Sequence, residues 1–368
     1  MRIPRCVPLA LLAASAFAAP QWKTRYFYDE DDSSLTLVDL KFPSPRRGIA
    51  AGVISGKNDS VKPVVIVTSD GGDHWTVQPL KEAARSLFFL DDSLGWMVTE
   101  RGIWKTEESG RSWQKLKAPS GIVRVYFADR DHGWAVGQKK AGYTTSDGGA
   151  TWEKLQAAES PKSSSEFTTY TWIEFATKQV GMIAGSSRPP RRLGQRLPDW
   201  IDPEAAVRRR EWPSLTVTLD TRDGGKTWTP STGSIFGDLT RIRLTPDGWG
   251  VGLFEYFDEF TWPSEIFSLD WKTGKSERVF RLKDRAITDV IIAPSGMVYA
   301  AGTEVTGRIR QTPVPGKVKM LRSKDRKAWE TLEVDYRVVG RRVTLAIADE
   351  ENVWAATDTG MILKLEGR

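Results

Sequence analysis

The chain is poor in the residues on which much enzyme chemistry depends, because its 368 residues include one cysteine and two histidines. The cysteine, Cys6, lies in an N-terminal segment typical of a cleaved signal peptide, so we expect none in the mature chain. Disulfides, thiolate metal sites and a cysteine nucleophile are thereby excluded. His74 and His132 are too few for histidine-based metal sites or Ser-His catalysis, and we expect both to be turn residues. No metal and no cofactor is predicted.

Long apolar runs and a strong net charge are also missing. The one long apolar stretch lies in residues 1–18, "MRIPRCVPLALLAASAFA", where Arg2 and Arg5 precede it and small residues follow. This pattern predicts a signal peptide, and no later segment approaches the roughly 18 apolar residues of a spanning helix. A net charge of +6 is too small to favour nucleic acid. We expect an exported, periplasmic or extracellular monomer, not transmembrane after cleavage, whose residues 19–368 form one domain.

Turn-forming and aromatic residues are abundant, with 32 Gly, 20 Pro and 16 Trp, and part of them recur in one motif. "TSDGGDHW" (Thr68 to Trp75) returns as "TSDGGATW" (Thr145 to Trp152), as "TRDGGKTW" (Thr221 to Trp228) and, weakened, as "TEESGRSW" (Thr106 to Trp113). A second motif of the type "D-x-x-x-G-W-A-V-G" precedes these octets. A catalytic site is rarely present four times, so the octet is interpreted as structural.

A period of about 40 residues, divided into short strands and turns, is typical of one propeller blade. The period predicts an all-β chain folded as a single seven-bladed β-propeller of four-stranded antiparallel blades. Its units lie at about 40–80, 85–117, 123–156, 170–232, 238–281, 286–334 and 342–368. The last unit has three strands, and we expect "WKTRYFY" (Trp22 to Tyr28) to pair with it and close the ring.

Each octet is expected to be a hairpin turn between the third and fourth strands of a blade. The acid accepts hydrogen bonds from turn N–H groups, the glycine adopts a left-handed conformation, and the indole packs back between strands. The residues given these structural roles are Asp70, Gly72, Trp75, Glu108, Gly110, Trp113, Asp147, Gly149, Trp152, Asp223, Gly225 and Trp228.

The octets match the Asp-box or BNR repeat, S/T-x-D-x-G-x-x-W, of β-propellers. With the "G-W-A-V-G" strands, they most resemble the photosystem II assembly and stability factors; sialidases and sortilin-type receptors are more distant. The resemblance implies a propeller that helps membrane-protein complexes form. It weakens at Ser268 to Ser276 and at Arg322 to Trp329, where the box is degenerate.

Enzymatic alternatives have few candidate residues. The arginine motif "R-I-P" that sialidases use occurs only at Arg2-Ile3-Pro4, inside the signal peptide. Glycoside hydrolysis needs two facing carboxylates. The candidates are Asp199, Asp202, Glu204, Asp258 and Glu259. A carbohydrate-binding or glycoside-hydrolysing propeller is therefore kept as the alternative function.

Long loops should mark the face opposite the Asp boxes, because successive turns of a blade alternate between its two faces. The largest is an insertion at residues 186–213 in blade four, rich in arginine and tryptophan, and two further loops lie near 255–264 and 303–316. Arginine and aromatic residues favour interfaces. The predicted partner-binding residues are Arg188, Arg191, Arg192, Arg196, Trp200, Arg208, Arg209, Arg210, Trp212, Tyr256, Trp262, Arg308 and Arg310. A solvated loop with no partner is the alternative interpretation of this insertion.

The function predicted from the sequence is a non-catalytic scaffold that binds a protein and assists assembly of a membrane-protein or envelope complex. An anionic glycan and a lipid headgroup remain open as alternative partners.

Overall fold

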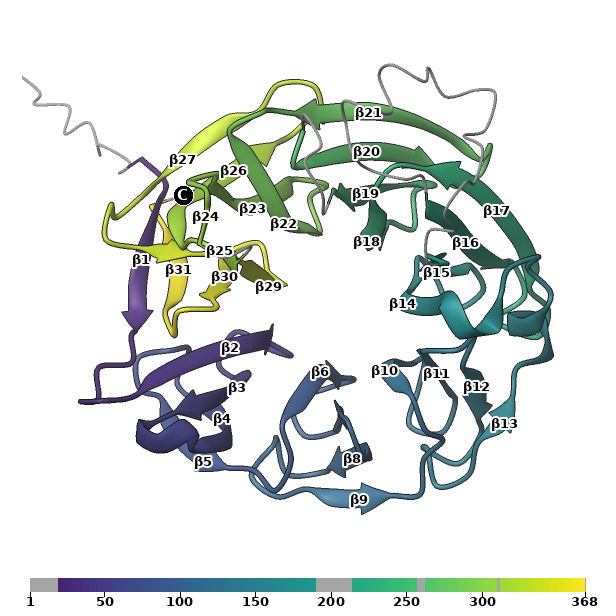
Figure 1. Cartoon of the computed structure of the whole chain (residues 1–368), viewed down its shortest axis with the longest axis horizontal. Coiled ribbons are helices and arrows are strands. Elements are labelled where there is room, and N and C mark those ends of the chain that lie inside the picture. Colours follow the sequence, from purple (N-terminus) through teal and green to yellow (C-terminus); the bar gives the residue numbers. More distant parts are fainter. Residues whose placement is uncertain (1–18, 190–213, 257–261, 310–311, 368) are drawn as a thin grey trace, which may run out of the picture.

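The computed structural model describes residues 19–189, 214–256, 262–309 and 312–367. Within these ranges the chain is almost entirely β structure, with 3-10 turns at Lys57–Asp59, Gln156–Glu159 and Ser165–Phe167. Figure 1 shows short sheets standing side by side around a common centre, each with its first strand innermost. The chain is thus a β-propeller, as the repeat predicts.

Five of the sheets each contain four consecutive strands in antiparallel order. They are β2 (Ser34–Lys41), β3 (Gly48–Ser55), β4 (Val61–Thr68) and β5 (Thr76–Pro79); β6 (Ala84–Phe89), β7 (Gly95–Thr99), β8 (Gly102–Thr106) and β9 (Gln114–Leu116); β10 (Ile122–Phe127), β11 (Gly133–Gly137), β12 (Gly142–Thr145) and β13 (Glu153–Lys154); β14 (Thr168–Phe175), β15 (Gly181–Ser187), β16 (Ser214–Thr221) and β17 (Thr229–Ile235); and β18 (Asp238–Leu244), β19 (Trp249–Glu255), β20 (Ser264–Asp270) and β21 (Lys275–Arg281).

The remaining strands form a larger sheet in the order β22-β23-β26-β27-β1-β31-β30-β29, with β28 beside β26. Its members are β22 (Arg285–Ile292), β23 (Val298–Glu304), β26 (Gly316–Ser323), β27 (Glu330–Val334), β28 (Val339–Gly340), β29 (Val343–Asp349), β30 (Asn352–Thr357), β31 (Ile362–Glu366) and β1 (Gln21–Tyr26). A small hairpin, β24 (Arg308–Ile309) and β25 (Thr312–Pro313), lies between β23 and β26. β1 is antiparallel to β31 and meets β27 in parallel over only two residue pairs.

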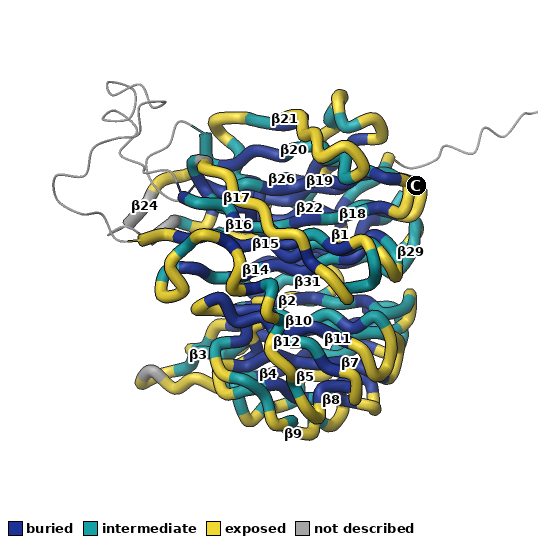
Figure 2. Tube along the Cα trace, turned by 90° about the vertical axis from the view of Figure 1, so that its right-hand side faces the viewer, coloured by how far each residue is buried: buried dark blue, intermediate teal, exposed yellow. Residues whose placement is uncertain are grey.

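The hydrophobic core lies between neighbouring sheets. One buried cluster joins Leu37 and Ile66 of the first sheet to Trp354 of β30. At the same interface, Phe42 stacks on Trp354 with ring centroids 4.2 Å apart. Figure 2 shows the resulting pattern, with buried stretches along the strands and exposed turns at the ends of the sheets. Alternating side chains therefore pack each sheet against the next around the ring.

The octets form tight turns between the third and fourth strands. In the first, the Gly72 N–H donates to Thr68 Oγ1 at 3.0 Å, and that hydroxyl donates to Asp70 Oδ1 at 2.8 Å. The His74 N–H donates to the same carboxylate at 3.0 Å, and the Trp75 indole N–H donates to the Gly72 carbonyl at 3.1 Å. Gly72 has a φ of +85°, which favours glycine.

The octet hydroxyl should contribute measurably to stability. Thr145 is buried, accepts from the Gly149 N–H at 3.0 Å and donates to Asp147 at 2.8 Å. We expect Thr145→Val to lower the free energy of unfolding by about 1–3 kcal/mol, because it leaves a buried N–H without its acceptor. Urea unfolding followed by tryptophan fluorescence measures this loss. Thr144→Val is the control, since that hydroxyl makes one long bond of 3.3 Å; equal losses would contradict the assigned role.

Candidate functional site

The innermost strands bring a set of polar side chains to the centre of the ring. In six of these strands the pairing register with the second strand shifts at the same place. Such a bulge inserts one extra residue and redirects the side chains beside it. The residues that follow the shift are Asp39, Ser86, Arg124, Trp172, Arg241 and Asp289.

Most of these side chains reach the next sheet around the ring. Asp39 Oδ2 accepts from the Leu87 N–H at 2.8 Å. Asp289 Oδ2 accepts from the Leu345 N–H at 2.9 Å in the same manner. Ser86 donates to the Val123 carbonyl at 2.9 Å. We call these contacts the inter-sheet ring; they hold neighbouring inner strands together where no ladder hydrogen bonds connect them.

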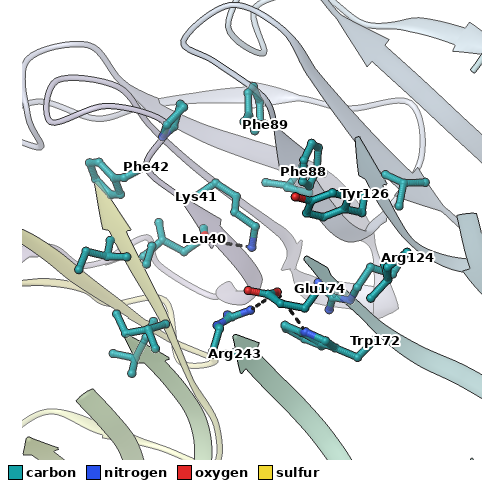
Figure 3. Close-up of a pocket in the computed structure, with 18 of the residues that line it drawn as sticks. Leu40, Lys41, Phe42, Phe88, Phe89, Arg124, Tyr126, Trp172, Glu174 and Arg243 are labelled. Carbon is teal, nitrogen blue, oxygen red and sulfur yellow. Dashed lines mark hydrogen bonds and ion pairs between the residues drawn. The ribbon is translucent and has the colours of Figure 1, made fainter. Parts of the chain in front are cut away.

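Three guanidinium groups surround the indole of Trp172. Their carbon atoms lie 3.8 Å (Arg124), 4.9 Å (Arg241) and 4.7 Å (Arg243) from its ring centroid. These distances are within the range of cation–π attraction. Figure 3 shows Glu174 between Arg243 and Trp172; its carboxylate accepts from Arg243 at 3.3 Å and from the indole N–H at 3.4 Å. We call Arg124, Arg241, Arg243, Trp172 and Glu174 the Trp172 cluster.

A cavity of about 350 Å³ opens beside this cluster. Lys41 and Glu174 point into it from opposite sides, while Phe88 and Tyr126 form part of its apolar wall (Figure 3). The Tyr126 ring stacks on Phe175 at 4.8 Å, and burial raises the pKa of its hydroxyl to about 12. The cavity therefore combines an aromatic wall with cations and one carboxylate, which suits a ligand carrying both an acidic and an apolar part.

Burial and neighbouring charge set the ionisation of the cluster. Burial lowers the pKa of Arg124 to about 10, so its guanidinium remains charged at neutral pH. Burial also lowers the pKa of Lys41 and raises that of Glu174, the latter against the attraction of Arg243. Burial opposes ionisation of Asp39, but the charges of Lys41 and Arg124 outweigh it and hold the pKa of Asp39 below its usual value. The Lys41 ammonium lies 2.5 Å from Asp39 Oδ1.

The cavity opens towards the Asp-box face of the ring. It is lined by the final residues of the inner strands, such as Phe89, Ile292 and Ile347. The Asp-box turns lie at the same ends of the sheets, because the Gly148 N–H donates to the Asp131 carbonyl in the turn after β10, at 2.9 Å. The sequence predicts function on the opposite face, among the long loops. The described cavity lies instead on the Asp-box face.

Most of the predicted partner-binding residues fall outside the described residues. These are Arg191, Arg192, Arg196, Trp200, Arg208, Arg209, Arg210, Trp212 and Arg310. Arg308 begins β24. Arg188 pairs with Asp238 at 2.9 Å, and Arg281 lies 4.1 Å above the ring of Trp262.

Tyr256 requires a correction. The sequence predicts it on the partner-binding surface, but it is buried and its hydroxyl donates to Glu265 at 2.7 Å. Its side chain is therefore part of the packed interior of the described residues. The candidate acids Asp199, Asp202, Glu204, Asp258 and Glu259 lie outside the described residues.

Two general observations bear on the site. The described residues contain no group of three or more His, Cys, Asp or Glu side chains arranged to hold a metal ion. None of the helices in the described ranges has the length and apolar character needed to cross a bilayer. Within the Trp172 cluster Glu174 pairs with Arg243, so three guanidinium groups face a single carboxylate.

Comparison with known proteins agrees with this architecture. The family profile of the photosynthesis system II assembly factor YCF48 matches residues 114–189. No curated protein sequence matches the chain. A structure of YCF48 bound to D1 peptide is 16% identical, with a TM-score of 0.58, over 92% of this chain and 98% of that one.

Two further solved structures share the fold. YCF48 from Cyanidioschyzon merolae is 15% identical, with a TM-score of 0.60, over 94% of this chain and 98% of that one. The WD40 β-propeller domain of Doa1 is 11% identical, with a TM-score of 0.57, over 96% of this chain and 98% of that one. The chain is therefore a β-propeller similar to YCF48, in sequence over residues 114–189 and in fold over nearly its whole length.

Proposed function

We propose that this protein is an exported, non-catalytic seven-bladed propeller that binds a segment of a partner protein during assembly of a membrane or envelope complex. The Trp172 cluster carries the proposal, because it places Arg124 and Arg243 beside an aromatic-walled cavity at the centre of the ring. Arginine forms paired hydrogen bonds with carboxylates and stacks on aromatic rings, which suits an acidic or aromatic peptide. A YCF48 structure bound to D1 peptide supports peptide binding by this fold.

Seven blades and a closed ring are part of this proposal. The antiparallel run β29, β30, β31 and β1 supports a last blade built from both ends of the chain. Closing the ring in this way would cover the strand edges that otherwise pair with other chains. Export is proposed from the signal-peptide pattern of residues 1–18.

Glycoside binding or hydrolysis is the rival function, and the inner-strand carboxylates Asp39, Asp289 and Glu174 are the observation in its favour. Asp39 and Asp289, however, each accept backbone N–H bonds from two inner strands, which favours a structural role. Glu174 has a raised pKa and would be the acid of such a mechanism. Release of sugar from a polysaccharide panel, lost in Glu174→Gln, would establish this rival.

Site-specific photo-crosslinking in the source cells tests the proposal. A photoreactive residue replaces Phe88 in the cavity wall, or Leu282 on the exposed surface as the control. We expect a discrete protein adduct through position 88 only. Its yield should fall about tenfold when Arg124 and Arg243 are replaced by Met, because the cations that pair with an acidic segment are lost. A thermal melt confirms that each variant is folded; equal adducts from both positions would refute the cavity beside the Trp172 cluster as the binding site.

The arginine-rich insertion is tested in a parallel arm. Arg191, Arg192, Arg208, Arg209 and Arg210 are replaced together by Ser in the protein carrying the position-88 cross-linker. A lower adduct yield would assign the loop to the same partner, because these cations would then assist its capture. An unchanged yield would remove the insertion from the proposed binding surface.

A further inference from the structure

The four sheets that carry an octet, including the weakened one of Trp113, share one aromatic contact. A phenylalanine at the end of the inner strand meets the edge of the box tryptophan, with nearly perpendicular rings. The pairs, with their centroid distances, are Phe42 and Trp75 (5.9 Å), Phe89 and Trp113 (6.2 Å), Phe127 and Trp152 (6.2 Å), and Phe175 and Trp228 (6.0 Å). This contact fills the space beneath each Asp-box turn.

The sheet of β22, β23, β26 and β27 departs from that arrangement. Its inner strand ends in Ile292, which pairs with Val298 as Phe127 pairs with Gly133. Its box tryptophan, Trp329, packs instead on Phe280 of the preceding sheet at 5.2 Å and donates to the Val279 carbonyl at 3.0 Å. The space that the phenylalanine and indole fill elsewhere is therefore left without those rings.

A cavity of about 470 Å³ occupies this position. Trp249, Ile292, Lys324 and Arg326 are among its lining residues, and we call it the Trp249 cavity. It also shares Ile292 and Ile347 with the cavity beside the Trp172 cluster. One extended segment on the Asp-box face could therefore enter both cavities.

The chemistry of the Trp249 cavity is aromatic and mainly cationic. The guanidinium carbon of Arg326 lies 4.1 Å from the Trp249 ring centroid. Arg326 has a φ of 63° in the degenerate box turn, a left-handed conformation that the other boxes give to Gly71, Ser109, Gly148 and Gly224. Lys324 adds a second cation, and Asp247 is the single acid in the lining. A ring inserted beside Trp249 would be stacked, and carboxylates flanking that ring would meet the two cations.

We propose that the Trp249 cavity is a second subsite, which receives an aromatic side chain of an acidic peptide segment. This inference rests on the proposed function and extends it by naming the chemistry of the bound segment. Loss of the regular phenylalanine contact creates the space, and Arg326 supplies both a stacking partner and a charge. The subsite selects for the aromatic residue, while the Trp172 cluster binds the acidic remainder.

Fluorescence anisotropy with two labelled peptides tests the subsite. Both are eight residues long and rich in Asp and Glu, with a central Phe in one and Ala in the other. We expect wild-type protein to bind the Phe peptide roughly tenfold more tightly than the Ala peptide. Ile292→Phe, which restores the regular ring and fills the cavity, should abolish this preference, as should Arg326→Gln. Arg222→Gln is the matched control, because Arg222 lies over Trp271 at 5.0 Å outside the cavity and should leave the preference intact.

The outcomes separate the two proposals. Arg243→Met should weaken both peptides equally. Arg326→Gln should weaken both peptides and the Phe peptide more, because it removes a charge as well as a stacking partner, whereas Ile292→Phe should weaken mainly the Phe peptide. Equal affinity of wild-type protein for the two peptides, or binding of neither, would overturn the subsite. A preference that survives Ile292→Phe would also overturn it. If cellohexaose quenched the tryptophan fluorescence of wild-type protein but not that of Trp249→Ala, the cavity would be assigned to a glycan instead.

Discussion

Asp39→Ala is expected to lower the free energy of unfolding by about 3–5 kcal/mol, because it breaks a buried charge pair and the inter-sheet ring together. Asp39 is 5% exposed and accepts from the Leu40 N–H at 2.9 Å and the Leu87 N–H at 2.8 Å. The substitution leaves both N–H groups without an acceptor and Lys41 without its counter-charge. Guanidinium unfolding, monitored by tryptophan fluorescence, measures the change.

Glu100→Ala provides the control, since that side chain is 82% exposed and makes one weak pair at 3.5 Å. Its effect should remain within about 0.5 kcal/mol. A loss below about 1 kcal/mol for Asp39→Ala would mean that the inter-sheet ring does not stabilise the fold.

Asp39 should also make stability depend on acid pH. Its folded-state pKa lies below the unfolded value of about 3.9, so its ionised form stabilises the fold above that pH. The stability it contributes is lost as the pH falls through the folded pKa. Urea unfolding of wild type and Asp39→Asn from pH 7 to pH 2 should show their difference narrowing below about pH 4. A constant difference across this range would contradict the assigned charge pairing.

The repeating turns were predictable because each carries its information within eight consecutive residues. In the first octet the Thr68 hydroxyl accepts a backbone hydrogen bond, the Asp70 carboxylate accepts from that hydroxyl, and Gly72 adopts the left-handed conformation. The structure shows these hydrogen bonds. The all-β character and the antiparallel sheets follow from the same period. The predicted insertion of residues 186–213 begins where β15 ends at Ser187, and β16 resumes at Ser214.

The Trp172 cluster was not predicted, because its residues come from three strands that lie far apart in the chain. Arg124, Trp172 and Arg243 belong to three inner strands, and none stands in a motif. The sequence did contain a signal for these residues, namely their constant spacing from the phenylalanine of each repeat. Arg124 and Trp172 both lie three residues before the phenylalanine that ends an inner strand, as does Asp39 before Phe42. Aligning the repeats on that phenylalanine would have revealed a polar column facing the centre.

The face of the cavity was also beyond a prediction based on loop length. Long loops identify where the chain has room to vary, whereas the described cavity is formed by side chains at the ends of inner strands. Ile292 illustrates the difference, because it replaces the regular phenylalanine in the wall of the Trp249 cavity, as Leu244 and Ile347 do in the two flanking sheets. Loop composition carries no information on such a change within the sheets.

Gly72→Ala is expected to destabilise the protein by about 2–5 kcal/mol, because two separate costs coincide at this position. A Cβ would lie 2.2 Å from Cη2 of Trp354, a fully buried ring stacked on Phe42, and Gly72 has a φ of +85°. Gly274→Ala separates the two costs: its φ is +73°, but nothing lies within 4 Å of the added atom. That control should lose only the backbone cost of about 1–2 kcal/mol.

Thermal and urea unfolding of both variants give the difference, which measures how tightly the Asp-box turn packs on the neighbouring sheet. Equal losses would mean that the glycine is required by backbone conformation alone, and that the box secures its own hairpin without helping to hold adjacent sheets together.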